Sequence, residues 1–443
     1  MSASAAWAAT ADRDELGCAM HRLIAELYPI CRSITGDGVR ETLRVLQRHV
    51  PLTVHEVPSG TAVFDWTVPN EWNIRDAYVK DSRGERVIDF RRSNLHVMGY
   101  SVPVHRTLSL AELRPHLHTL PDHPDWIPYR TSYYRDDWGF CLSERQLATL
   151  TEDEYEVRVD ATLAPGHLTY GEYYLPGTTP AEVLISAHVC HPSLCNDNLS
   201  GVALAAFLAQ RLGARPRRYS YRFLFMPATI GAITWLCAHQ GDVANIRHGL
   251  VLACVGDAGH VSYKRSRRGD AEIDRAVAQV LKDAGGRHDL EAFSPYGYDE
   301  RQFCSPGFDL PVGRLSRTPH GRFPEYHTSA DDLDFVRPAA LADSFVTCLA
   351  VLSLLEHNET YVNQNPQCEP QLGRRGLYRA MGGYQDERVD ETALLWVLNL
   401  SDGRHSLLAI AERSGLPFDR VQRAAAVLET HALLRRDPGL AAS

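Results

Sequence analysis

The feature that most constrains this 443-residue chain is an alternation of short apolar runs with longer helix-length runs between residues 166 and 358. The short runs have the length and composition of strands, and the longer runs have the length of helices. Strands are predicted at 168–175, 182–188, 222–226, 248–255 and 310–315, and helices at 199–212, 230–239, 271–283 and 338–355. Strand–helix alternation of this kind predicts an α/β fold with a mainly parallel sheet whose faces are covered.

The flanking regions have a different composition. Residues 14–50 show helical periodicity with a break at Pro29. Residues 52–162 contain short strand-like segments separated by Gly, Pro and Asp, with many Trp and Tyr residues. Residues 392–436 are spaced like a helix-turn-helix with a wing. We expect an α/β domain at 14–55 and 163–362, a β-rich insert lobe at 56–162, and a winged-helix-like domain at 385–438.

Charge, hydropathy and cysteine usage exclude several classes of protein. The 55 acidic and 46 basic residues give a net charge of −9, so general affinity for nucleic acid or an anionic membrane is not expected. Apolar runs such as 201–210 and 346–355 are expected to be too short and too mixed to span a bilayer. The first residues lack the basic stretch of a secretory signal, and no CxxC pair exists. We therefore expect a cytoplasmic protein.

The densest polar cluster is SAHVCHPSLCNDNLSG, residues 186–201, between a predicted buried strand and a helix. Open α/β sheets place their sites at the carboxyl ends of such strands. His188 ends the strand and Asp197 lies at the turn into the helix. A neutral imidazole and a carboxylate that converge there suit Zn²⁺.

Two downstream segments add candidate ligands. His327 lies beside carboxylates in the segment FPEYHTSADD, residues 323–332, and Asp257 follows the strand expected at 248–255. We expect His188, Asp197 and His327 to bind a metal, and the alternative is a buried hydrogen-bond network without one. Asp257 is a candidate ligand or a residue that orients a ligand. Cys190 could ligate a soft metal, but small buried packing is the favoured role.

The order of His188, Asn-Asp197-Asn-x-Ser-Gly, Asp257 and Tyr-His327-Thr-Ser-x-Asp331 resembles the zinc aminopeptidases of the M28 type. The chain is similar, from about residue 23 to 436, to a bacterial aminopeptidase-like family (DUF4910 type) with a β-rich insert (DUF2172 type) and a C-terminal winged helix. The motifs that carry this closer resemblance are RSITGDG at 32–38, FDW-x-VP-x-EW at 64–72, CHP at 190–192, TIG at 229–231 and YDERQ at 298–302. The resemblance implies a Zn-peptidase-like fold with His188, Asp197, Asp257 and His327 as metal ligands.

Two departures from the M28 pattern affect the expected chemistry. Cys190 stands where those enzymes have an Asp that orients the ligand, and residues 227–231 (PATIG) replace their Glu-Glu pair of base and ligand. The loss of one ligand favours one zinc over two. The loss of the base requires another proton acceptor. The candidates are Glu300, Glu325 and His191, and His191 could also be a ligand, a proton shuttle or a structural cap.

Other polar residues are candidates for substrate binding. Arg32 would contribute a cation to a substrate carboxylate, or merely belong to a helix-capping turn. Asn196, Asn198 and Arg301 would steady the oxyanion or the substrate ends. The aromatic residues of the insert lobe would roof a substrate cleft or simply form the core of the lobe.

These observations predict a zinc-dependent, aminopeptidase-like hydrolase that acts on an amide or peptide bond with a free amine nearby. The expected partner is a small peptide or an amide-bearing metabolite, such as a precursor of a natural product or polysaccharide. A single-zinc acyltransferase or cyclase and a catalytically silent binding protein are the alternatives. Residues 417–428 carry Arg420 and Arg423 but also Asp419, so we expect the C-terminal domain to support homo-oligomerisation and not DNA binding.

Overall fold

The computed structural model describes residues 12–151, 153–377 and 390–437, and these residues form two compact units. The larger unit contains residues 12–269 and 289–345. The smaller unit contains residues 270–288, 346–377 and 390–437. No disulfide joins any of the ten cysteines, all of which lie in the described residues.

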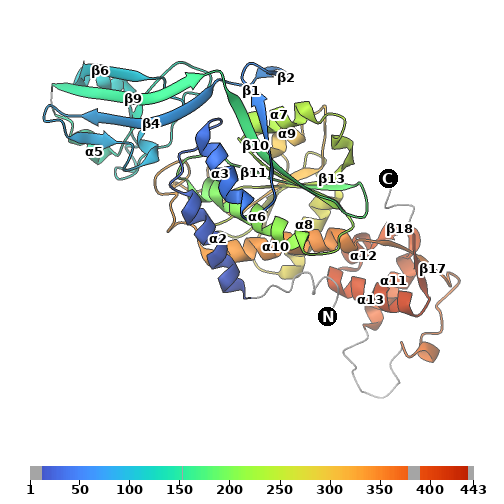
Figure 1. Cartoon of the computed structure of the whole chain (residues 1–443). Coiled ribbons are helices and arrows are strands. Elements are labelled where there is room, and N and C mark those ends of the chain that lie inside the picture. Colours follow the sequence, from blue (N-terminus) through green and yellow to red (C-terminus); the bar gives the residue numbers. More distant parts are fainter. Residues whose placement is uncertain (1–11, 152, 378–389, 438–443) are drawn as a thin grey trace. The chain divides into compact units, whose positions relative to one another are not determined.

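An eight-stranded mixed sheet forms the core of the larger unit (Figure 1). In spatial order its strands are β1 (Thr53–Pro58), β10 (His167–Leu175), β12 (Ser220–Met226), β11 (Glu182–His188), β13 (Ile246–Leu252), β16 (Val312–Ser316), β14 (Ser262–Lys264) and β15 (Asp289–Glu291). The central strands β12, β11, β13 and β16 are parallel to one another, whereas β1, β10 and β14 join antiparallel. The predicted α/β sheet is therefore confirmed, and its edges are mixed.

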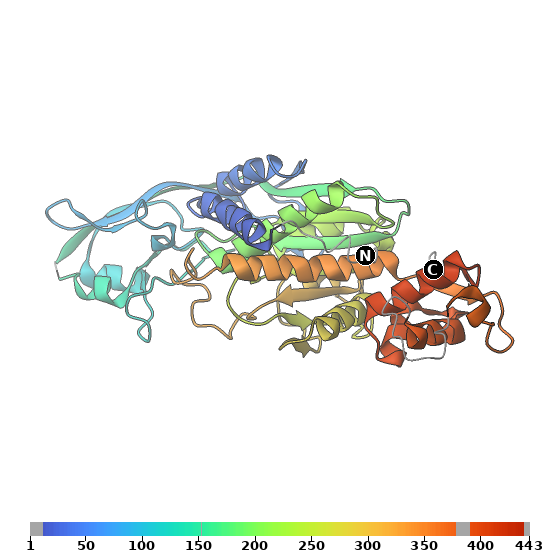
Figure 2. The same cartoon turned by 90° about the horizontal axis from the view of Figure 1, so that it is seen from below.

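Helices cover this sheet, and Figures 1 and 2 show three of them on one side of it. Those three are α2 (Arg13–Leu27), α3 (Asp37–Gln47) and α6 (Gly201–Gly213), and the unit also contains α7 (Ile230–Ala238) and the short α9 (Glu300–Phe303). Nearly every side chain of α6 is buried, because the helix packs across β11, β12 and β13. Right-handed crossovers from β11 to β12 and from β12 to β13 run in opposite directions, which places α6 and α7 on opposite faces.

The insert between β1 and β10 forms a separate β-rich lobe, seen beside the large sheet in Figure 1. Its antiparallel sheet has the order β5 (Arg86–Asp89), β4 (Glu71–Lys80), β9 (Glu154–Ala164) and β6 (Val104–Ser109). Smaller elements are β2 (Ala62–Val63), β3 (Trp66–Thr67), η1 (Asn94–His96), α4 (Leu110–Leu113), η2 (Arg114–His116), β7 (Leu117–His118), β8 (Phe140–Cys141) and α5 (Glu144–Ala148). Trp72, Phe140 and Tyr155 are buried in its core.

The smaller unit has a winged-helix arrangement. Its elements are α8 (Glu272–Ala284), β17 (Thr360–Asn363), η5 (Gly373–Arg375), α11 (Glu391–Leu400), β18 (Asp402–Ser406), α12 (Leu407–Ser414), α13 (Phe418–Thr430) and β19 (Leu434–Arg436). A three-stranded sheet has the order β18-β17-β19. β17 was expected at the end of the α/β domain, so the boundary at residue 362 differs. Its pairing partners lie about 40 and 70 residues downstream, which local sequence does not reveal.

The long helix α10 (Pro338–His357) is the one described helix with the length and apolar composition to cross a membrane. The sequence analysis had expected its apolar run to be too short and too mixed. In the structure, 67% of its most apolar window is buried within the protein, as in the core helices of water-soluble proteins.

Candidate metal centre

The loop after β11 carries the centre of the site. β11 is buried along its whole length and ends at His188. Residues 195–200 then form an irregular turn (η3, Cys195–Ser200) before α6, and Asp197 departs from helical backbone angles within it. This departure turns Asp197 back towards the end of the strand. His188 Nε2 and Asp197 Oδ1 are 2.9 Å apart.

A second acidic residue, Asp331, fixes the position of Asp197 through the backbone. The backbone N–H groups of Asn196 and Asp197 both donate to the carboxylate of Asp331. Asp331 is completely buried, and burial raises the pKa of its carboxyl to about 8. Residues 196 and 331 are far apart in sequence, so this contact closes the site between two distant loops.

His327 reaches Asp197 from the opposite side. Its Nε2 is 2.9 Å from Asp197 Oδ2, and its backbone has a positive φ of 57°. The lobe holds this loop in place, because Tyr129 N donates to His327 O at 2.8 Å and Ser329 N donates to Ile127 O at 2.8 Å. The Tyr129 ring lies edge-on to the imidazole of His327, with centroids 5.1 Å apart. The insert lobe therefore forms part of the site.

His191 completes the cluster. Its ring centroid is 5.0 Å from those of both His188 and His327, and its Nε2 is 3.9 Å from Asp197 Oδ2. The ligand atoms of His188, His191 and Asp197 all lie within 4.8 Å of one another. Burial lowers the pKa of His191 to about 3, so its imidazole is neutral. Although burial opposes it, the charge of His188 and the hydrogen bonds with His188 and His327 hold the pKa of Asp197 well below its usual range.

This donor set fits a divalent metal such as zinc. Neutral imidazoles and an ionised carboxylate are the ligands that Zn²⁺ takes in proteins. Three imidazoles around one buried carboxylate supply both the donors and the negative charge. Of the roles left open for His191, the geometry favours that of a ligand.

A cavity of about 520 Å³ opens over these imidazoles. His191, His327, Cys190 and residues 228–230 line it on the sheet side, and Ile34 lies between the two sides. Aromatic side chains from the lobe line the opposite wall, namely Trp66, Tyr129, Tyr133 and Tyr134. The predicted aromatic roof thus faces the cavity, while Trp72, which is buried in the lobe, is core.

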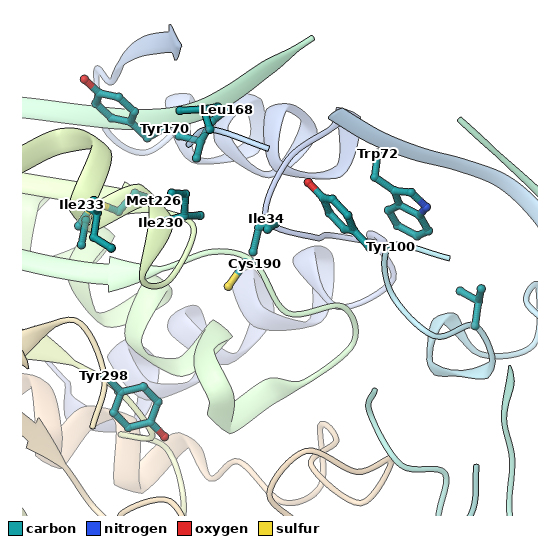
Figure 3. Close-up of a cluster of buried hydrophobic side chains, with 14 of the residues drawn as sticks. Ile34, Trp72, Tyr100, Leu168, Tyr170, Cys190, Met226, Ile230, Ile233 and Tyr298 are labelled. Atoms are coloured by element: carbon teal, nitrogen blue, oxygen red, sulfur yellow. The ribbon is translucent and has the colours of Figure 1, made fainter. Parts of the chain in front are cut away.

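Cys190 has the packing role that the sequence analysis favoured. It belongs to a buried hydrophobic cluster that also contains Ile34 and Ile230 (Figure 3). The Ala228 N–H donates to Cys190 Sγ at 3.3 Å, and burial raises the pKa of the thiol to about 12. A protonated thiol with this partner packs against the site without ligating the metal.

The prediction that Asp257 is a ligand is wrong. Its Oδ1 accepts from Gly259 N and Thr318 Oγ1, and its Oδ2 accepts from Asn196 Nδ2 and Thr318 N. These four bonds leave the carboxylate no free direction towards the imidazoles. Asp257 instead has the alternative orienting role, because it holds Asn196 next to Asp197.

Three residues predicted to bind substrate form hydrogen bonds within the protein. Asn196 Oδ1 accepts from Gly256 N, and Asn198 bonds Leu252 O, Cys254 N and His188 Nδ1. Arg32 is buried and donates to the carbonyl oxygens of His191 and Leu27. These bonds satisfy buried backbone atoms of the loops, which spacing alone does not show, and the predicted roles of the three residues in substrate binding stay predictions.

Besides His191, the predicted bases are Glu300 and Glu325, which lie in different surroundings. Glu300 is completely buried, and its Oε1 pairs with Lys264 at 2.8 Å while its Oε2 has no hydrogen-bond partner among the described residues, so its role as the base stays a prediction. Glu325 lies in a series of turns, two residues before His327. Arg301 Nη2 lies 3.4 Å from Thr229 Oγ1, next to the cavity wall. Roles for Glu325 and Arg301 stay predictions.

The sequence analysis missed Asp299, although it lies inside the quoted YDERQ motif. Asp299 is buried behind Thr229, which lines the cavity, and its Oδ1 accepts from Thr229 N at 2.7 Å. Its Oδ2 has no hydrogen-bond partner among the described residues. Burial raises the pKa of Asp299 to about 6, against the opposing charge of His188. The available signal in the sequence was that Asp299 is an acidic residue directly before Glu300, the glutamate that was predicted as a base.

Comparisons with known proteins show the family of this chain. Residues 21–358 match the family described as a domain of unknown function (DUF4910), and residues 359–436 match a winged helix-turn-helix family. A protein of Clostridium acetobutylicum, named for polysaccharide biosynthesis and an aminopeptidase-like domain, is 55% identical over 95% of this chain and 97% of its own length.

Solved structures give the same fold. A crystal structure of a Clostridium acetobutylicum protein named as a peptidase has a TM-score of 0.92 and 53% identity, and covers 96% of this chain and 97% of that one. A zinc aminopeptidase of Bacillus subtilis has a TM-score of 0.54 at 12% identity, with 76% and 94% of the two chains covered. A peptidase M28 precursor of Shewanella amazonensis has a TM-score of 0.52 at 12% identity, with 78% and 96% covered. The chain is thus a member of the DUF4910 family, with an aminopeptidase-like domain of the M28 fold and a C-terminal winged helix.

Proposed function

We propose that the protein is a hydrolase that uses one zinc ion to cleave an amide bond in a small molecule. The observation that carries this proposal is the convergence of His188, His191 and His327 on the buried carboxylate of Asp197. These four residues would hold the ion. One ion is favoured over two because Asp257, the residue expected to serve as a further ligand, is saturated by hydrogen bonds within the protein.

When bound, zinc polarises a carbonyl oxygen and lowers the pKa of water. The chain's own residues orient these donors. The carbonyl of His191 is held by Arg32, and the ring of His188 is held between Asn198 Nδ2 and Asp197 Oδ1. Tyr129 packs edge-on against both His191 and His327 and lines the cavity beside them. These contacts fix the positions of the imidazoles around Asp197.

We assign the proton-accepting role to Asp299. Its Oδ1 is anchored by the N–H of Thr229, which lines the cavity, and its Oδ2 is unpartnered. Thr229 stands in the PATIG segment that replaces the missing Glu-Glu pair, so a carboxylate from another loop is supplied at the same wall. A carboxyl with a pKa of about 6 is ionised at neutral pH and can accept a proton there.

The name of the Clostridium acetobutylicum relative supports a role in the synthesis of a polysaccharide precursor. We propose an amide-bearing metabolite of that kind, or a small peptide, as the partner. A cytoplasmic location, the absence of nucleic-acid and membrane partners, and homo-oligomerisation through the C-terminal domain are predictions of the same standing.

Elemental analysis of the purified protein tests the metal. We expect one zinc per chain, and its loss in His188→Ala and in His327→Ala. Turnover of amide substrates should disappear with the zinc and return when it is added back. Wild-type protein that takes up no zinc from buffered solution would favour a catalytically silent binding protein.

A pair of variants tests the proton acceptor. Asp299→Asn should keep the zinc and lower the turnover number by about 10²–10⁴-fold, the usual contribution of a positioned base. Glu325→Gln is the matched control, since it changes another carboxylate candidate. A large loss in Glu325→Gln with full activity in Asp299→Asn would reverse the assignment.

A further inference from the structure

The charged residues that line the cavity are not those expected for an aminopeptidase-like site, which would bind a free amine. None of the described residues that line it is acidic, and Arg130 lies at its rim. A substrate with a free ammonium group would lose its hydration there, and the one carboxylate proposed to act beside this lining, Asp299, is assigned to the reaction as its proton acceptor, so the loss would be poorly compensated. The lining therefore favours an acyl group without a free amine, in contrast to the free amine expected from the sequence.

The lobe side of the cavity contains an exposed pair of aromatic rings. Trp66 is 42% exposed and Tyr134 is 51% exposed, and their centroids are 5.6 Å apart at an angle of 68°. Among the described residues, neither the indole N–H of Trp66 nor the hydroxyl of Tyr134 has a hydrogen-bond partner. The pair thus combines solvent-exposed aromatic faces with polar groups that have no hydrogen-bond partner among the described residues.

These features match the chemistry of a sugar ring. A pyranose has an apolar face of C–H groups that packs on aromatic rings, and hydroxyl groups around its edge that form hydrogen bonds. Trp66 and Tyr134 supply the apolar contact, and their own polar atoms with Arg130 and Thr131 lie within the same lining. A linear peptide would use the rings but leave most of these polar groups unpaired.

We infer that the substrate is an N-acylated amino sugar, with its ring on Trp66 and Tyr134 and its amide towards His191 and His327. This inference rests on the proposed amide hydrolysis. In the reaction, water oxygen adds to the acyl carbon and the C–N bond breaks. The acyl group leaves as a carboxylic acid, and the sugar nitrogen takes up a proton to become the free amine.

Three groups of amides test the substrate class. The first contains N-acetylated glucosamine, galactosamine and mannosamine. The second contains the same sugars acylated with glycine, which adds only a free amine, and the third is N-acetylethanolamine, which lacks the ring. We expect turnover of at least one N-acetylated sugar at a kcat/KM more than tenfold above its glycyl counterpart and above N-acetylethanolamine.

Binding is measured separately by calorimetry with the zinc-free and the zinc-loaded protein. Trp66→Ala should weaken binding of the preferred sugar by about tenfold, the size expected for the loss of one aromatic contact. Phe64→Ala is the matched control, because Phe64 is 51% exposed on the same hairpin and packs on Phe308 but does not line the cavity. It should leave binding unchanged.

The outcomes separate this inference from the proposed function. Preferred turnover of the glycyl sugars would overturn the inference and leave amide hydrolysis standing. Binding of an N-acetylated sugar that depends on Trp66, without turnover of any amide, would support the sugar site and contradict the hydrolase. If none of the three sugars binds to either form, or if Phe64→Ala weakens binding as much as Trp66→Ala, the inference is wrong.

Discussion

The two walls of the cavity differ in burial and in hydrogen bonding. On the sheet side, Asp197, Asn196 and Asp331 are completely buried, and their polar atoms bond one another or the backbone. On the lobe side, Trp66 and Tyr134 are largely exposed and contact each other through their rings. The hydrogen bonds hold the buried residues in a single arrangement, whereas the polar groups of the exposed aromatic residues have no hydrogen-bond partner among the described residues.

This difference in burial and hydrogen bonding indicates that the two walls have different roles. A buried network with every group paired is rigid, and removal of any member leaves its partners unsatisfied. Exposed aromatic residues on a small hairpin are replaceable at low cost to folding. We therefore expect changes in the buried wall to affect metal binding and stability together, and changes in the lobe wall to affect ligand choice alone.

The largest effect is expected from Asp197→Asn. This change keeps the shape of the side chain but removes the charge that three imidazoles share. We expect zinc affinity, measured by competition with a chelator, to fall by more than about 100-fold, because even residues that only orient a ligand account for 10–100-fold. Asp343→Asn, on the exposed side of α10, is the control, and an equal loss there would contradict the assignment.

Asp257→Ala tests whether Asp257 orients a neighbouring residue or is itself a zinc ligand. It removes the acceptor of four hydrogen bonds, so we expect the free energy of unfolding to fall by about 3 kcal/mol. Zinc affinity should fall by only about tenfold, since no ligand is lost. Chemical denaturation and chelator competition measure the two effects. Complete loss of zinc in a folded variant would restore Asp257 as a ligand.

The pH dependence of stability tests the buried carboxyl of Asp299. Burial raises its pKa in the folded protein to about 6, above the unfolded value of about 3.9. The folded state therefore binds more protons at this group between these values, and the contribution of Asp299 to wild-type stability should decrease from about pH 4 to pH 6 and then level off. Asp299→Asn lacks this titration, so it should gain about 1–3 kcal/mol relative to wild type across that interval. A difference that is constant with pH would contradict the raised pKa.

The smallest effect is expected on the lobe side. Tyr129→Phe removes the hydroxyl that lies 3.0 Å from Tyr133 OH but keeps the ring against His191 and His327. We expect a loss of about 1 kcal/mol or less in the free energy of unfolding, and unchanged zinc content. Loss of zinc in this variant would show that the lobe wall is as closely coupled to the metal as the buried wall.

Part of the architecture was predictable because it depends on local patterns. The apolar runs predicted β11, α6, β12 and α7 almost to the residue, since strand and helix length and periodicity are properties of neighbouring residues. The polar loop at the end of β11 predicted His188 and Asp197, and the downstream motif predicted His327. These residues lie at strand ends and in loops, where polar side chains are seldom explained by packing.

The rest depended on contacts between distant segments. Asp257 and Asp299 are both carboxylates close to predicted strands or helices, and no local signal shows that the first is saturated by Thr318 and Asn196 while the second keeps an unpartnered oxygen. Residues 127–129 pair with residues 327–329, which brings the lobe to the candidate metal centre. The local sequence of neither segment predicts this pairing.

The sequence by itself therefore determined the α/β fold, the position of the polar loops and the residue types that suit zinc. Only the tertiary structure decided which carboxylates bind the protein's own backbone, which histidines meet around Asp197, and which aromatic side chains face the cavity. The physical reason is that secondary structure follows from interactions between near neighbours. A site at the carboxyl ends of several strands is assembled from residues more than a hundred positions apart, and its free groups are those that folding leaves unpaired.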